Sequence, residues 1–284
     1  MIDLHTHSTY SDGTFTPADL LRAAAGAGLE AVALTDHDTV RGVLSLGGAP
    51  PPLPFVPGIE MSIQYREDLR FHMLGLFIAP SRPEAAEFER FNQEKRHERN
   101  RLIVERLNAL GYRMEYQEAV ARAEGIVGRM HIALTLVDKG YFPSVAAVFA
   151  AVMNHGKPAY VARFRYSAPR GIEFIHALGG VAMLAHIGKE LTERDEIRTV
   201  LADLKGKGLD GLETRHPDHA PELRVWLDAL AKELGLAASG GSDFHGGNKP
   251  SVSLGRGLGD LEVPVDVYFR LKELAESRRR SQGS

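Results

Sequence analysis

Short apolar runs that end in, or lead into, histidine or an acidic residue recur along this chain, and they constrain its fold more than any other feature. Ile2–His5, Ala31–Thr35 and Val181–Ala185 are three such runs, and helical stretches such as Pro17–Ala27 lie between them. Alternation of β and α segments is typical of parallel strands joined by crossover helices. We therefore expect an α/β fold, as an open sheet or a barrel. The other strand candidates are Phe55–Ser62, Phe71–Ile78, Gly211–Thr214 and Leu236–Ser239.

The middle of the chain has a different pattern. Residues 83 to about 110 predict one long, highly charged helix, shorter helical pieces follow it, and strand signals return only near Ala159. This change of pattern indicates an insertion into the α/β body. We expect a helical insertion domain over residues 81–157 and a barrel domain formed by residues 1–80 and 158–284.

Composition excludes several classes of function. The chain has 284 residues and no cysteine, so disulfides, thiolate metal sites and cysteine nucleophiles are excluded. A formal net charge of −3 gives no overall positive field for long duplex nucleic acid. The longest apolar run falls short of the roughly 20 residues that a membrane span needs. Because Met1–His5 already has the pattern of a strand, we expect no signal peptide and a cytoplasmic protein that binds no membrane.

His5 and His7 form an HxH pair at the end of the first predicted strand. Residues i and i+2 of a strand point to the same side, so both imidazoles can bind one metal ion. Asp12 follows within Ser11-Asp12-Gly13, where it also fits a simple turn. Neither motif alone distinguishes a metal site from an ordinary strand end followed by a turn.

Further candidate ligands follow or interrupt the other apolar runs. His37 follows Ala31–Thr35, which is where α/β proteins place ligands and catalysts, although a helix cap would also fit there. Glu60 and His72 lie inside apolar runs, where a carboxylate is costly unless it is paired or bound to a metal. His131 begins a helix of the insertion, where a lone histidine is more often structural.

The candidates meet at one mouth if the predicted strands form a barrel. The set combines seven histidines with three carboxylates: His5, His7, His37, His72, His131, His186, His245, Asp12, Glu60 and Asp243. One tetrahedral ion takes four ligands, so this set suits two or three divalent ions. Such ions would make the mouth positive, which favours an anionic substrate such as a phosphate ester. Adjacent metals can activate water as hydroxide for in-line displacement.

Seven motifs occur in a fixed order: His5-Thr6-His7, Ser11-Asp12-Gly13, Thr35-Asp36-His37-Asp38, Pro57-Gly58-Ile59-Glu60, Phe71-His72, Ala185-His186 and Gly241-Ser242-Asp243-Phe244-His245. Together they resemble the PHP (polymerase and histidinol phosphatase) family over nearly the whole chain. The resemblance implies a distorted (β/α)7 barrel with a trinuclear metal site.

The resemblance also implies a role for each matching residue. One metal would bind His5, His7, Glu60 and Asp243, a second would share Glu60 and take His72 and His131, and a third would bind Asp12, His37 and His245. The resemblance also implies a catalytic role for His37 and Asp243. His186 is assigned to phosphate contact or to protonation of the leaving group.

Within the family, the insertion resembles the branch of nucleoside 3′,5′-bisphosphate phosphatases and 5′→3′ exonucleases on short RNA. Gly128-Arg129-Met130-His131 and Gly156-Lys157-Pro158 carry this resemblance, which implies that Arg129 and Lys157 contact substrate phosphate. His216 follows a predicted strand, and either a substrate contact or a structural role fits its position.

Three functions remain as hypotheses. The first is a metal-dependent phosphoesterase that acts on a nucleoside 3′,5′-bisphosphate or on 5′-phosphorylated short RNA. The second is a small-molecule phosphatase for a nucleoside monophosphate, histidinol phosphate or a cyclic phosphate. The third is a non-catalytic metal-binding module, which an incomplete ligand set would favour. Nitrogen and oxygen ligands without sulfur favour Mn²⁺ and permit iron or zinc, with two or three ions per chain.

Overall fold

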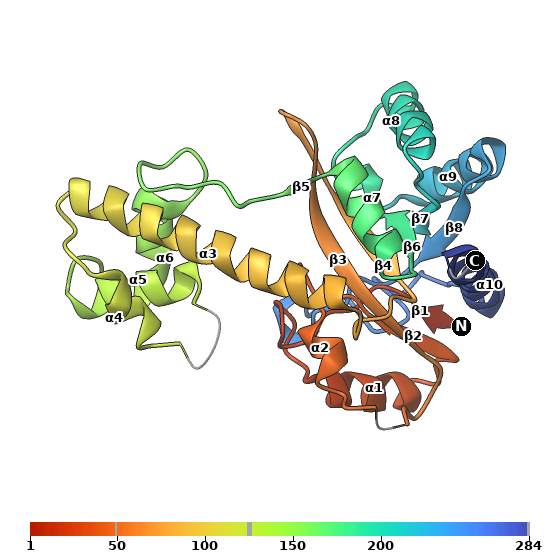
Figure 1. Ribbon diagram of the computed structural model, residues 1–284, viewed down its shortest axis with the longest axis horizontal. Coiled ribbons are helices and arrows are strands. Elements are labelled where there is room, and N and C mark those ends of the chain that lie inside the picture. The colour runs from red at the N-terminus through yellow and green to blue at the C-terminus, as the bar shows by residue number, and fades with distance from the viewer. Residues whose placement is uncertain (49, 124–126, 283–284) are drawn as a thin grey trace. The chain divides into compact units, whose positions relative to one another are not determined.

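The computed structural model describes residues 1–48, 50–123 and 127–282 (Figure 1). The chain divides into two compact units, of which the first comprises Met1–Ala86 with Arg165–Ser284 and the second Glu87–Phe164. The sequence predicts an insertion over residues 81–157, and both of these boundaries lie a few residues before those of the second unit. The long helix α3 (Pro83–Ala109) starts within the first unit, so the change to helical sequence precedes the division into units.

A sheet with both parallel and antiparallel pairs forms the centre of the first unit. Its strands are β1 (Ile2–Asp3), β2 (Ala31–Leu34), β3 (Phe55–Arg66), β4 (Leu69–Leu76), β5 (Tyr166–Ser167), β6 (Val181–Leu184), β7 (Gly211–Arg215) and β8 (Ala237–Gly240). The strands pair in the order β1-β2-β3-β4-β6-β7-β8, and β5 pairs with β3. All pairs are parallel except those that β4 makes with β3 and β6. The α/β class and the mostly parallel sheet predicted from the sequence are confirmed.

The direction of β4 differs from the simple β-then-α prediction. Only Glu67 and Asp68 separate β3 from β4, and Arg66 pairs with Leu69 across this turn. Two residues can join antiparallel strands, whereas a parallel pair needs a crossover of a dozen residues or more. Glu60 lies inside β3 and His72 lies inside β4, as the apolar runs around them predict.

Backbone hydrogen bonds connect the two extremes of the sheet. The N–H of Leu4 donates to the carbonyl of Gly240 (3.3 Å), that of Asp243 to His5 (2.9 Å), and that of His7 to Phe244 (2.9 Å). Thr6 and Phe244 form a parallel bridge. The segment after β8 thus lies beside the segment after β1, as the expected distorted barrel requires.

Helices cover the strands of the first unit, as Figure 1 shows for α1, α7, α9 and α10. The helices are α1 (Pro17–Gly26), α2 (Arg41–Leu44), α7 (Ala168–Ala177), α8 (Arg194–Gly206), α9 (Pro221–Leu234) and α10 (Val265–Gln282), with 3-10 turns η2 (Ile187–Lys189) and η3 (Gly246–Asn248). Local signals explain their ends. Thr16 caps α1 by accepting the N–H of Asp19, and Gly235 ends α9 in the left-handed conformation. Ile2, Leu4, Val56 and other side chains with no exposed surface fill the core beneath these helices.

The second unit is helical and has its own core. After α3 it contains α4 (Tyr116–Val120), α5 (Arg129–Asp138), α6 (Val145–Val148) and a π-helical turn, η1 (Phe149–Met153). Ile103 and Leu107 of α3 pack with Ile132 and Leu136 of α5 in this core, and all four are fully buried. Within the described ranges, no helix is both long and apolar enough to cross a membrane.

Candidate metal centre

His5 and His7 lie just beyond β1 and are fully buried. Their Nε2 atoms are 3.1 Å apart. The Nδ1 atom of His5 lies 3.0 Å from Oε1 of Glu213, so this nitrogen donates its hydrogen to the carboxylate. In the neutral ring, Nε2 of His5 then presents a lone pair to the interior of the site, which is the arrangement of a metal-binding histidine.

Glu60 lies at the centre of the cluster and is fully buried. Its Oε2 lies 2.9 Å from Nδ1 of His37 and 3.3 Å from Nε2 of both His5 and His7. Despite these short distances, neither Oε2 of Glu60 nor Nδ1 of His37 has a hydrogen-bond partner. The other oxygen, Oε1, lies 3.0 Å from Nδ1 of His72 and from Nε2 of His186.

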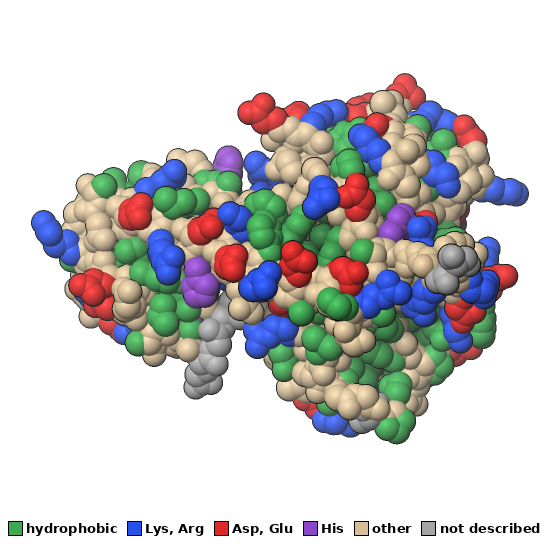
Figure 2. Space-filling model, in the orientation of Figure 1, with side chains coloured by type: hydrophobic (Ala, Val, Ile, Leu, Met, Phe, Trp, Pro, Cys, Tyr) green, Lys and Arg blue, Asp and Glu red, His purple; other side chains and the backbone are tan. Residues whose placement is uncertain are grey.

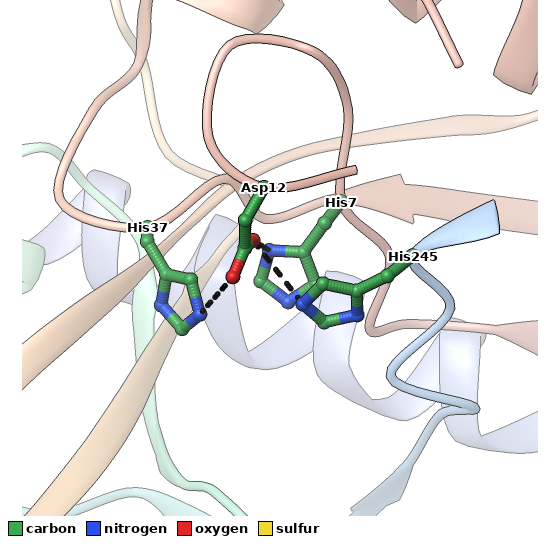
Figure 3. A group of neighbouring side chains, drawn as sticks. All are labelled: His7, Asp12, His37 and His245. Carbon is green, nitrogen blue, oxygen red and sulfur yellow. Dashed lines mark ion pairs between the residues drawn. The ribbon is translucent and has the colours of Figure 1, made fainter. Parts of the chain in front are cut away.

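Asp12 forms a second group with three histidines (Figure 3). Its loop directs the carboxylate towards the rings, with Oδ1 at 3.2 Å from Nε2 of His245 and 3.8 Å from Nδ1 of His7. Oδ2 lies 3.7 Å from Nε2 of His37. The carboxylate is also half exposed, so this group opens towards solvent. The turn residue of the sequence analysis is therefore placed where a metal ligand would be.

Asp243 bridges the cluster from the other end of the sheet. Its Oδ1 lies 3.3 Å from Nε2 of His7, 3.6 Å from Nε2 of His5 and 3.4 Å from Nδ1 of His245. Asp243 has φ of 56° and His186 has φ of 24°, values that non-glycine residues rarely adopt. Such conformations persist only where the surroundings enforce them, and they are concentrated at functional sites.

The donor set fits divalent metal ions. Among the described residues, four groups have potential ligand atoms that lie within 4.8 Å of one another inside the group: His7, Asp12, His37 and His245; His5, His7 and Glu60; His5, Glu213 and His216; His37, Glu60 and His72. Ligands about 2.1 Å from one ion lie roughly 3 to 3.5 Å apart, which is close to the separations around Glu60. A metal would also satisfy the buried Oε2 of Glu60 and Nδ1 of His37, which have no hydrogen-bond partner.

The electrostatics of the site hold its acidic groups ionised. Burial opposes charge on His5, but Glu213, Glu60 and Asp243 together raise its pKa well above the usual value. Burial would raise the pKa of Glu60, yet His37, His72 and His5 lower it well below the usual value. For His186 burial dominates and lowers the pKa to about 4, so this imidazole is neutral near pH 7.

Glu213 is a further candidate residue of this cluster, which the sequence analysis missed. It is fully buried in β7, where Oε1 accepts from His5 and Oε2 accepts the backbone N–H of His186 at 2.9 Å. Burial would raise the pKa of Glu213, but the positive charge of His5 and the hydrogen bond from His5 lower this pKa to about 2. A carboxylate within an apolar strand is the signal that identified Glu60, and the same signal marks Glu213.

Hydrogen bonds between hydroxyls and carboxylates support the loops that carry the candidate ligands. Asp36 accepts the backbone N–H of Ser8 (2.8 Å) and the hydroxyls of Ser8 (2.7 Å) and Ser11 (2.6 Å). Asp3 accepts the backbone N–H and hydroxyl of Ser242, next to Asp243. These bonds fix the Ser8–Asp12 loop and the segment after β8, and so position Asp12 and Asp243.

The structure brings together most of the candidate residues. Those of the first unit form one cluster: His5, His7, Asp12, His37, Glu60, His72, His186, Asp243 and His245, with His216 beside Asp243. His131, Arg129 and Lys157 belong to the second unit. There, Nδ1 of His131 accepts the N–H of Gly128 at the start of α5, Arg129 donates to the carbonyl of Met153, and Lys157 is exposed.

Comparison with known proteins agrees with this fold and this donor set, which together define a metal-dependent hydrolase. Residues 3–114 match the PHP domain family. The chain is 33% identical over 270 residues to a protein from Haemophilus influenzae named 5′-3′ exoribonuclease, covering 94% of this chain and 97% of the relative. The chain therefore belongs to the PHP family, a family of metal-dependent phosphoesterases.

Two further relatives come from Chromobacterium violaceum. One is named 3′,5′-nucleoside bisphosphate phosphatase and is 33% identical over 248 residues, covering 86% of this chain and 87% of the relative. The other is a solved structure of an amidohydrolase with bound sulfate and no metal. It is 31% identical, has a TM-score of 0.72, and covers 98% of this chain and 96% of that one.

Proposed function

We propose that this protein hydrolyses phosphate esters of nucleotides, either a nucleoside 3′,5′-bisphosphate or the 5′ end of short RNA. The observation that carries this proposal is the convergence of buried histidines and carboxylates on Glu60, whose Oε2 has no hydrogen-bond partner. Relatives named exoribonuclease and nucleoside bisphosphate phosphatase, each matched over most of the chain, support the choice of substrate.

We assign the candidate residues to ligation and catalysis as follows. His5, His7, Asp12, His37, Glu60, His72, Asp243 and His245 would hold two or three divalent ions. The family resemblance adds His131 as a ligand. Nitrogen and oxygen ligands favour Mn²⁺ and also permit iron or zinc. Bound ions would supply activation of the attacking water and stabilisation of the leaving oxygen.

His186 is suited to act on the substrate rather than on a metal. Its Nε2 hydrogen-bonds to Oε1 of Glu60, while Nδ1 is buried and has no hydrogen-bond partner. The ring is 5% exposed and is fixed through its backbone N–H by Glu213. We assign His186 to contact with the phosphoryl group or to proton transfer to the leaving oxygen.

The second unit also contains positive charge that suits a phosphorylated substrate. Burial, together with the charges of Arg129 and Arg163, lowers the pKa of Arg99 to about 10. We assign Arg129 and Lys157 to phosphate contacts. On the face shown in Figure 2, acidic and basic side chains are otherwise interspersed in each unit. A short substrate fits this distribution better than long duplex nucleic acid.

A substrate panel tests the proposal directly. The Mn²⁺-loaded protein would be given adenosine 3′,5′-bisphosphate, AMP, histidinol phosphate, a cyclic phosphate and a 5′-phosphorylated RNA trimer. We expect turnover of the bisphosphate or the trimer, lost in His37→Ala and retained in His176→Gln, a histidine outside the cluster that pairs with Asp210. Turnover restricted to another member of the panel would reject the bisphosphate and short-RNA assignment and favour the small-molecule phosphatase. No turnover by protein that holds its metals would also reject this assignment.

A further inference from the structure

Three donor side chains from neighbouring strand ends surround one oxygen of Asp243. Lys189 follows β6, His216 follows β7 and Lys249 follows β8, and these three strands are adjacent in the sheet. Oδ2 of Asp243 lies 3.0 Å from Nζ of Lys189, 2.7 Å from Nζ of Lys249 and 3.6 Å from Nε2 of His216. We call Lys189, His216 and Lys249 the lysine site.

The two oxygens of Asp243 have separate surroundings. Oδ1 faces the rings of His5, His7 and His245, all within 3.6 Å, and belongs to the metal centre. Oδ2 faces the lysine site. The carboxylate of Asp243 is therefore the border between a group of metal ligands and a group of hydrogen-bond donors.

His216 contributes a buried donor that lacks an acceptor. Its side chain is 1% exposed, and its Nδ1 accepts the backbone N–H of Asp218 at 3.1 Å. In the neutral ring the hydrogen therefore resides on Nε2, and this atom has no hydrogen-bond partner because Asp243 is too distant at 3.6 Å. A buried donor of this kind is costly unless a ligand satisfies it.

The charges at the lysine site are balanced only while Asp243 remains a free carboxylate. Lys189 lies between Asp218 (2.9 Å) and Asp243 (3.0 Å), and Lys249 contacts Asp243. Once Asp243 shares its charge with a metal, Asp218 alone opposes two ammonium groups. Both lysine side chains are about one third exposed, so an incoming anion can reach them.

We propose that the lysine site binds a second, non-reacting phosphate group of the substrate. Two ammonium groups and one imidazole N–H match the several oxygens and the double negative charge of a phosphate. The assignment deepens the proposed function and rests on it. It predicts that the enzyme prefers a nucleoside bisphosphate, or an RNA end with a neighbouring phosphodiester, to a nucleoside monophosphate.

Lys249→Met tests this assignment in the full-length, Mn²⁺-loaded protein. We would compare kcat/KM for adenosine 3′,5′-bisphosphate with the values for the 3′- and 5′-monophosphates. Loss of one charge-assisted hydrogen bond should lower the preference for the bisphosphate by about tenfold to 100-fold. Lys249→Arg should retain most of the preference. Lys232→Met, a change at an exposed lysine of α9, is the matched control and should leave the preference unchanged.

Binding provides a second measurement that does not depend on turnover. Isothermal titration calorimetry would use adenosine with non-hydrolysable methylenephosphonate groups at both the 3′ and 5′ positions, and the analogue with only one such group. In Lys249→Met, the affinity for the first analogue should fall by the same factor as the kinetic preference, with the Mn²⁺ content unchanged.

The outcomes separate this inference from the proposed function. An unchanged preference in Lys249→Met would overturn the lysine site while leaving nucleotide hydrolysis intact. An equal loss for all three substrates, accompanied by loss of Mn²⁺, would also overturn it, because the lysines would then only orient Asp243. If the wild-type protein hydrolyses no nucleotide, the proposed function fails. The two analogues still test the lysine site, and equal affinity for them would reject it.

Discussion

The metal centre and the lysine site lie side by side, but their buried charges are balanced in opposite ways. Around Glu60, acceptor atoms of histidines and carboxylates face one another, and two of these atoms have no hydrogen-bond partner. Around Oδ2 of Asp243, two lysines neutralise the carboxylates they contact. A cation would complete the first arrangement, whereas the second has donors available for an anion.

This difference follows from the order of strands in the sheet. The ends of β1 and β2 and the middles of β3 and β4 supply His5, His7, His37, Glu60 and His72. The ends of β6 to β8 supply the lysine site, and Asp243 connects the two groups. Substitutions in the metal centre should therefore abolish hydrolysis of every substrate, whereas substitutions in the lysine site should alter substrate preference.

Glu60→Gln should produce the largest effect. The amide keeps the shape of Glu60 but loses the charge that lies between five histidines. We expect kcat to fall by about 10²- to 10³-fold for every substrate, the typical loss for one preorganised electrostatic group. Steady-state kinetics with Mn²⁺ measures this effect, and Glu233→Gln on the surface of α9 is the control. Retention of wild-type kcat would contradict the central position given to Glu60.

Removal of metal should destabilise the first unit. Binding of an ion to the folded state alone stabilises it by about 2.7 kcal/mol when free Mn²⁺ is 100 times its Kd. Thermal unfolding after treatment with EDTA should therefore occur several degrees lower, and added Mn²⁺ should reverse the change. If Tm were the same with and without Mn²⁺, the charges around Glu60 would be balanced without a cation. The contrast drawn with the lysine site would then be wrong.

Glu213→Gln should weaken metal binding without removing a residue that we assign as a metal ligand. The carboxylate orients His5 through Nδ1 and holds the backbone of His186. Loss of such an outer carboxylate typically costs about tenfold to 100-fold in metal affinity or activity. Titration of the metal-free protein with Mn²⁺ measures the affinity, and excess Mn²⁺ should restore part of the activity. Unchanged Mn²⁺ affinity would show that Glu213 does not orient His5.

Arg278→Ala should have the smallest effect. Because Arg278 lies outside the metal centre and the lysine site, this variant shows how much activity is lost through general destabilisation alone. Arg278 of α10 pairs with Asp210, which also accepts from His176. We expect a loss of about 1 kcal/mol in the free energy of unfolding, measured by urea denaturation, and no change in Mn²⁺ affinity or kcat. A fall in kcat comparable to that of Glu213→Gln would show that general destabilisation explains the losses in the cluster.

The candidate ligands of the first unit could be recognised from the sequence because their signal is local. Histidine or aspartate directly after an apolar strand, and glutamate within one, can be recognised without knowing which strands are neighbours. The same reasoning applied to Glu213 would have found it. The antiparallel direction of β4 could also have been predicted, because Glu67 and Asp68 leave room only for a hairpin.

The lysine site could not be predicted in the same way. Lys189 ends the short 3-10 turn η2 and Lys249 directly follows η3, and lysine is common in such segments and carries no periodic signal. Their relation to Asp243 depends on the adjacency of β6, β7 and β8, which only the assembled sheet shows. Likewise, the unpartnered Nε2 of His216 depends on the hydrogen bond that its Nδ1 accepts.

Counting the ions bound by the metal-free protein on titration with Mn²⁺ tests the central claim most directly. Isothermal titration calorimetry, with the Mn²⁺ content of the dialysed complex measured separately, gives this number. We predict two or three Mn²⁺ per chain in the wild-type protein, and fewer in Glu60→Gln. A wild-type protein that hydrolyses phosphate esters while binding no Mn²⁺, iron or zinc would contradict the central claim.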